Sequence, residues 1–184
     1  MLHWPIRDDI ELRLPEARYA DELLRLIDAN RSRLGQWLHW VHSTHTREDV
    51  LSYVQMARKD FVKPDFLHFL IFRKGEIVGG CGLILNELTN SAEIGYWIDA
   101  KFEGMGIVSD CCRALIDYAF GEMELSRVQI RCATGNLRSA AIPKRLGFSH
   151  EGTLRQTIRT NDRLDDEHCY GLLRSDWEAA SNGQ

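Results

Sequence analysis

A strand, a glycine-bearing loop and an amphipathic helix follow one another between residues 92 and 120. Residues 92–98 are mostly apolar, and residues 101–106 carry two glycines. The apolar positions that follow recur at i, i+1, i+4, i+5, i+8 and i+9: Ile107, Val108, Cys111, Cys112, Leu115, Ile116, Ala119 and Phe120. A helix with this stripe buries one face. The segment therefore predicts a helix packed on a sheet, which is a layered architecture.

The rest of the chain divides into shorter segments, some with the alternation of a strand and others with the apolar spacing of a helix. Strands are expected at residues 10–14, 66–72, 77–85, 127–133, 148–157 and 167–173, between turn signals. Helices are expected at residues 17–27, 34–41, 46–57 and 136–146, with Thr46 as an N-cap. Paired strands combined with strand–helix–strand crossovers predict the α/β class with α+β character, in which helices cover both faces of a mixed sheet.

Size and charge narrow the class of protein. The 184 residues are 44% hydrophobic and contain no repeat or Gly/Ser-rich linker, so one domain over residues 1–184 is expected. The net charge of −4 gives no general attraction for nucleic acid. The longest apolar run, residues 77–85, is far shorter than the ~20 residues of a membrane span. Residues 1–10 do not form a secretion signal, so a cytoplasmic protein is expected.

Cysteines and histidines do not indicate a metal site. The five cysteines form no CxxC pair, which favours buried, reduced thiols over a zinc site or a disulfide framework. His39, His42 and His45 are spaced three apart, but no matching carboxylate pattern accompanies them. We therefore expect no metal.

The loop at residues 101–106 has the composition of an anion site. Glycines allow a phosphate close to the backbone, and the N-terminus of the following helix adds partial positive charge. The dinucleotide fingerprint fails because Ser109 stands where its third glycine belongs. The Walker pattern fails because no lysine follows Gly106.

The loop resembles the acetyl-CoA loop of the GNAT superfamily, Q/R-x-x-G-x-G/A, with Glu103, Gly106 and Val108 at its marked positions. Further segments are similar to the second GNAT signature: Arg127 to Cys132, Asn136, Ser139 and Arg145 to Phe148. Others resemble the ribosomal-protein serine/alanine N-terminal acetyltransferase branch: Asn30 to Leu38, Glu151 to Gln156 and Leu172 to Trp177. The resemblance covers nearly the whole chain.

This resemblance implies a GNAT fold, with a central, mostly antiparallel, twisted sheet of about seven strands. Its fourth and fifth strands, residues 92–98 and 127–133, would splay apart, with helices on both faces. It also implies acetyl-CoA as co-substrate, no metal, and direct acetyl transfer to a primary amine, first of all the N-terminal α-amine of a ribosomal protein. Two alternatives stay open: a small amine (polyamine, amino acid or aminoglycoside) as acceptor, and a non-catalytic acyl-CoA sensor. A monomer or homodimer is expected, as is common among relatives.

The resemblance also implies roles for individual residues. The cofactor would be held by Trp97, Ile98, Glu103, Gly104, Met105, Gly106, Ile107, Val108, Asn136, Ser139 and Arg145, with Arg138 and Lys144 as further candidates for its phosphates. For Arg138, Lys144 and Arg145 a solvated helix face is the alternative. Glu93 is the leading base, against the alternative of a strand glutamate in an ion pair. Ser139 is the leading proton donor or thiol-binding group. Trp37 and Tyr96 are expected to contact the acceptor.

Three positions depart from the family pattern. Glu103 replaces Gln or Arg, and a carboxylate beside a pyrophosphate would repel it unless the side chain points away. Val108 replaces Gly or Ala. Pro143 stands where many members carry a tyrosine proton donor, and Tyr170 is either its substitute or a core residue.

Overall fold

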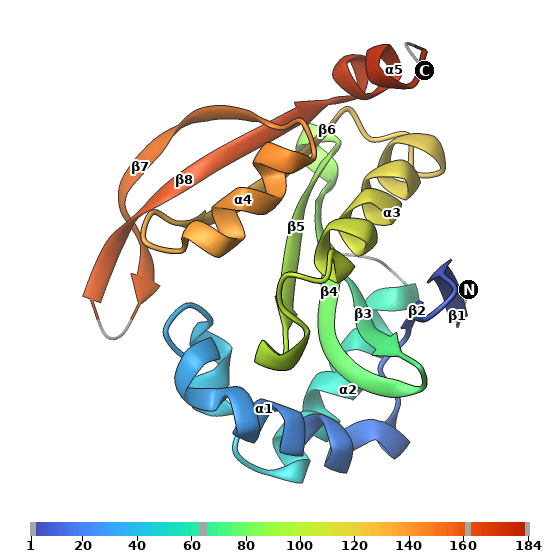
Figure 1. Ribbon diagram of the computed structural model, residues 1–184, viewed down its shortest axis with the longest axis vertical. Helices are drawn as coiled ribbons and strands as arrows, with labels where there is room; N and C mark the ends of the chain where they lie inside the picture. The colour runs from blue at the N-terminus through green and yellow to red at the C-terminus, as the bar shows by residue number, and fades with distance from the viewer. Residues whose placement is uncertain (1–2, 63–65, 161–162, 183–184) are drawn as a thin grey trace.

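The computed structural model describes residues 3–62, 66–160 and 163–182. Within them, eight strands form one sheet in the order β1-β2-β3-β4-β5-β6-β8-β7 (Figure 1). The strands are β1 His3–Arg7, β2 Ile10–Arg13, β3 Phe66–Arg73, β4 Glu76–Asn86, β5 Ser91–Ile98, β6 Arg127–Ala133, β7 Ser149–Thr160 and β8 Arg163–Leu173. The predicted class, a mixed sheet with helices on both faces, is confirmed.

Helices connect these strands. The α-helices are α1 Ala20–Leu34, α2 Arg47–Val62, α3 Ile107–Gly121, α4 Leu137–Arg145 and α5 Arg174–Asn182. Short 3₁₀ turns are η1 Ala17–Tyr19, η2 His39–Ser43, η3 Glu87–Thr89 and η4 Ala100–Phe102. In the part of the chain described here, no helix is long and apolar enough to cross a membrane.

The N-terminal region differs from the predicted element pattern at two places. Strand β1 was not predicted because its polar residues hide the pattern; it pairs with β2, and Trp4 packs edge-on against Phe69 and Tyr118. The helix expected at residues 34–41 does not form as one unit. Helix α1 already extends to Leu34, and a separate 3₁₀ turn, η2, follows.

The sheet is antiparallel except between β5 and β6. These two strands pair in parallel only at Ser91↔Arg127, Ala92↔Val128 and Glu93↔Gln129. Beyond Glu93 they diverge. The edges of β5 and β6 that face each other therefore border a gap, although each strand stays paired on its other edge. The predicted splay is therefore confirmed, and it opens a cleft in the middle of the sheet.

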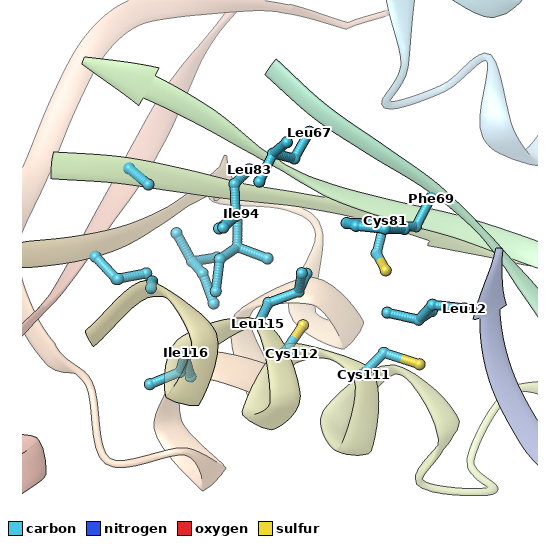
Figure 2. Packing of buried hydrophobic residues seen from close by; sticks show 14 of the residues in the cluster. Leu12, Leu67, Phe69, Cys81, Leu83, Ile94, Cys111, Cys112, Leu115 and Ile116 are labelled. Atoms are coloured by element: carbon cyan, nitrogen blue, oxygen red, sulfur yellow. The ribbon is translucent and has the colours of Figure 1, made fainter. Parts of the chain in front are cut away.

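Side-chain alternation along the strands builds a core on each side of the sheet. On β3, Phe69 and Ile71 face the α3 side, whereas Leu70 and Phe72 face α1 and α2. Figure 2 shows part of the larger core, where Leu115 and Cys112 of α3 point toward the sheet residues Leu83 and Ile94, and Cys111 lies near Leu12. These two cores hold the helices that wall the cleft.

Candidate functional site

A cavity of about 990 Å³ fills the splay between β5 and β6. Its walls come from the end of α1, the loop before α3, helix α4 and strand β8. It is lined by thirteen of the fourteen predicted site residues: Trp37, Glu93, Tyr96, Trp97, Ile98, Glu103, Gly104, Gly106, Ile107, Val108, Asn136, Ser139 and Arg145. Residues 90 or more positions apart in the sequence thus share one site.

Met105 is the exception. Its side chain is exposed, and its sulfur lies 3.3 Å from Nη1 of Arg73, away from the residues that line the cavity. The predicted cofactor contact of Met105 uses its backbone N–H, so it stays a prediction. Between two glycines in left-handed conformation, the chain turns the intervening side chain outward.

The loop before α3 has the backbone of an anion cradle. Gly104 and Gly106 adopt positive φ values of 74° and 77°, which favour glycine. Helix α3 begins directly afterwards at Ile107, so the N–H groups of its first turn have no acceptor within the helix. Arg145 of α4 reaches the same turn, donating from Nη1 to Oγ of Ser109 at 2.9 Å.

The carboxylate of Glu103 points at two arginines. Its Oε1 lies 2.6 Å from Nη1 of Arg33 on α1, and its Oε2 accepts a hydrogen bond from Arg138 on α4. The ion pairs offset its charge beside the anion cradle. The ion pairs therefore reduce the repulsion that we expected from Glu103 in place of Gln or Arg. They also leave the backbone of the loop available. Sequence reasoning missed Arg33.

A buried polar network fixes this loop to α1. Asn30 and Asp99 are only 4% and 7% exposed, and Nδ2 of Asn30 donates to Oδ1 of Asp99 at 3.0 Å. The oxygen of Asn30 accepts from the backbone N–H of Ala100 and from Arg33, each at 3.0 Å. Arg33 also donates to the carbonyl of Ile98. Buried groups satisfied in this way hold one geometry, so α1 sets the position of the loop.

Glu93 sits where β5 and β6 part. Its Oε2 accepts from Nε2 of Gln129 at 2.9 Å and from Nε of Arg131 at 2.7 Å. Arg131 also approaches Oε2 of Glu167, a β8 residue that is 6% exposed and lines the same cavity. The ion pair that we weighed as the alternative for Glu93 is present. Sequence reasoning missed Glu167 because it ends a run of acids, Asp165-Asp166-Glu167, in which no member stands out.

Ser139 and Tyr96 meet across the cleft. Asn136 is the N-cap of α4 and accepts from the backbone N–H of Ser139 at 3.1 Å. The Ser139 hydroxyl lies 3.0 Å from the Tyr96 hydroxyl. Burial raises the pKa of Tyr96 well above its ordinary value of 10. Tyr96 therefore stays protonated at neutral pH, and its hydroxyl also donates to the backbone carbonyl of Ser139 at 3.1 Å.

Other candidate residues do not line the cavity. Tyr170 is 1% exposed in the core, and Pro143 is buried within α4. His42 and His45 each direct a ring nitrogen at a backbone carbonyl, of Gly35 and His42 respectively. Among the residues that the structure describes, no three His, Cys, Asp or Glu side chains gather as a metal site would require. All five cysteines are free thiols.

Comparisons with known proteins agree with this geometry. The family model "Acetyltransferase (GNAT) domain" matches residues 9–149. "Putative ribosomal N-acetyltransferase YdaF" of Bacillus subtilis (strain 168) is 36% identical over 178 residues, covering 94% of this chain and 96% of that protein. The RimL ribosomal L7/L12 alpha-N-protein acetyltransferase, solved with coenzyme A, superimposes with a TM-score of 0.90 at 26% identity, covering 95% and 99%.

The microcin C7 self immunity acetyltransferase MccE, solved with acetyl-CoA and AMP, gives a TM-score of 0.87 at 29% identity, covering 91% of this chain and 94% of that one. An acetyltransferase family match over most of the chain favours an enzyme over an acyl-CoA sensor. With the splayed strands and the glycine loop in place, the chain belongs to the GNAT family of acetyltransferases.

Proposed function

We propose that this enzyme transfers an acetyl group from acetyl-CoA to the N-terminal α-amine of a protein, with ribosomal proteins as the first candidates. The observation that carries the proposal is one cavity in which an anion cradle, unpaired strand backbone and carboxylates meet. The cradle suits a pyrophosphate, and the strand edge suits an amide-bearing arm. The names of YdaF and RimL support the acceptor.

The cofactor would lie along the diverging half of β5. Backbone N–H groups between Glu103 and Val108 face the pyrophosphate, and Arg145 and Arg138 contribute positive charge from α4. The backbone near Trp97 and Ile98 provides hydrogen-bonding partners for the pantetheine arm. Asn136 and Ser139 then stand at the thioester end, beside Tyr96.

Acetyl transfer joins the amine nitrogen to the thioester carbonyl carbon and breaks the carbon–sulfur bond. A base must take a proton from the amine, and the leaving thiolate needs one. Glu93 serves as the base: both of its hydrogen bonds end on Oε2, so Oε1 can accept the proton or a bridging water. Glu167 is the second carboxylate within reach of the same arginine. Ser139 is the proton donor to sulfur.

A base of modest strength suffices for this acceptor. A free α-amine has a pKa of ~7.7 to 8.0, so a useful fraction is neutral near pH 7. Trp37, which lines the cavity beside Gly135, would contact the acceptor from the α1 side. MccE shares this fold under a name that points to a different acceptor, so a small amine remains the alternative to be tested.

The test is thiol release from acetyl-CoA with a panel of acceptors. It would compare peptides beginning with Ser or Ala with spermidine and an aminoglycoside. The proposal expects turnover on at least one peptide, with kcat/KM above that of either small amine. Turnover confined to the small amines would reject the protein acceptor and keep the chemistry.

Variants then separate the two carboxylates. Glu93→Gln should lower kcat by about 10²-fold or more, the usual contribution of a general base. Glu167→Gln, which keeps the same arginine neighbour, should cost less. The reverse order would move the base to Glu167, and coenzyme A affinity should be unchanged in both variants.

A further inference from the structure

A second cavity of about 660 Å³ continues from the first. Glu93 and Arg131 line both, so the two cavities meet at the ion pair where β5 and β6 part. The remaining wall runs toward the start of β5 and the η3 turn, and includes Ile84, Ser91 and Gln129. We call this second cavity the η3 groove.

The floor of the η3 groove is one face of the sheet. Strand register places Ile84, Glu93 and Gln129 side by side on β4, β5 and β6. A second row, Asn86, Ser91 and Arg127, lies two residues further along the strands. Side-chain alternation puts both rows on the face that α1 and α2 cover elsewhere, where Leu70, Phe72 and Trp97 pack against them.

The chemistry of this floor is polar, with one apolar spot. Ile84 is 43% exposed beside Glu93. Gln129 uses its amide nitrogen to reach Glu93, so its carboxamide oxygen remains an acceptor. The hydroxyls of Ser91 and Thr89 lie 2.7 Å apart and can donate or accept. The charge of Arg127 is matched by Glu151, at 2.6 Å between Nη1 and Oε1.

We propose that the η3 groove binds the residues that follow the acetylated N-terminus of a polypeptide acceptor. The amine would stand at Glu93, and an extended chain would cross the floor toward Ser91. The spacing of the two rows, about 7 Å, matches two residues of an extended peptide. Main-chain N–H and C=O groups suit the polar floor, and Ile84 suits an apolar side chain. A small amine would leave the groove unused, so this inference rests on the proposed protein acceptor.

The experiment compares acceptor lengths in a variant that fills the groove. Ser91→Arg places a long side chain on the floor, one row away from Glu93 and outside the cofactor loop. The acceptors are a six-residue peptide and its first two residues as an amide. We expect KM for the six-residue peptide to rise about tenfold or more. KM for the dipeptide amide and the Kd of coenzyme A should stay within about twofold of wild type.

Ser52→Arg on the exposed face of α2 is the matched control, since it adds the same side chain and charge outside the groove. Thr89→Arg is the second variant, in case Ser91→Arg lowers the melting temperature. Equal effects of Ser91→Arg and Thr89→Arg on both acceptor lengths, or no effect on either, would overturn the inference. If wild-type enzyme binds coenzyme A but acetylates no peptide, the proposed function itself fails.

Discussion

At the residue scale, two paired glycines have opposite roles. Gly82 and Gly95 face each other across β4 and β5. A Cβ on Gly82 would collide with the carbonyl oxygen of Leu67, whereas a Cβ on Gly95 would meet no atom within 4 Å. Gly95 lines the cofactor cavity beside Glu93. The first glycine therefore serves the sheet, and the second keeps space open in the site.

Gly95→Val should lower kcat/KM by about tenfold or more, because the new side chain projects into the cavity. Its melting temperature should equal or exceed that of wild type, since valine suits a strand better than glycine. Gly82→Ala should behave in the opposite way, with a loss of stability of ~1–3 kcal/mol from overpacking. Thermal unfolding and initial rates on both variants check this. If the Gly95→Val enzyme keeps wild-type activity, the reaction does not need the space beside Gly95.

Arg138 and Glu103 should shift coenzyme A affinity in opposite directions. Arg138 lines the cavity and is largely exposed, so its pair with Glu103 is weak and can yield to a phosphate. Arg138→Gln should raise Kd about fivefold, through loss of one exposed charge-assisted contact. Glu103→Gln should lower Kd, since it removes a negative charge beside the cradle.

Isothermal titration with coenzyme A, dephospho-coenzyme A and pantetheine checks this pair. The effect of Arg138→Gln should persist for the second ligand and vanish for the third if the pyrophosphate is the contact. Arg113→Gln, an exposed arginine of α3 paired with Asp110, is the control. An unchanged Kd in Arg138→Gln would show that the arginine does not contact the cofactor.

At the element scale, β3 carries a buried histidine against α2. The His68 ring stacks on Phe66 at 3.8 Å between centroids, meets Tyr53 edge-on, and places Nε2 3.3 Å from Asp60 of α2. Desolvation lowers the pKa of His68 below 6.5, although Asp60 partly opposes it. The folded state therefore favours the neutral ring.

This lowered pKa predicts a loss of stability at acidic pH. Below about pH 6.5 the unfolded chain binds a proton that folded His68 resists, so the free energy of unfolding falls as pH drops toward the folded pKa. His68→Gln should flatten this slope between pH 7.5 and 5.5 in urea unfolding. His39→Gln, at an exposed histidine, should leave the slope as in wild type. Equal slopes in all three proteins would contradict the assignment.

At the scale of the whole molecule, the cofactor would join elements that the splay separates. The cavity takes residues from α1, β5, β6 and α4, so a ligand there stabilises their arrangement. At 100 times its Kd, coenzyme A should add ~2.7 kcal/mol. For a chain of this length that shifts the melting temperature by about 5–10 °C.

Differential scanning fluorimetry checks this shift, with Arg138→Gln as a variant that should move less at the same ligand concentration. A single transition is expected with and without ligand, because the two cores pack on opposite sides of one sheet. That outcome would support the prediction of one domain. Two transitions would reject it, and an unchanged melting temperature would contradict cofactor binding in the cavity.

Local patterns along the chain were enough to predict most of the elements, the anion loop and the family. Apolar periodicity located α3 and most strands because burial of one face imposes it locally. The loop could be predicted because positive φ values favour glycine at two nearby positions, 104 and 106. Strand β1 and the break after Leu34 could not be predicted from local patterns. Strand β1, for example, is held by tertiary contacts of Trp4.

The partners of the charged residues, by contrast, depend on how the strands and helices pack in three dimensions. The ion pair of Glu103 with Arg33 spans 70 positions, and Glu93 reaches Arg131 across the splay. Glu167 joined the site through the pairing of β6 with β8. Such contacts leave no local pattern, because a surface charge and a site charge look alike until the strands are in register. The η3 groove likewise exists only because three strands align their rows.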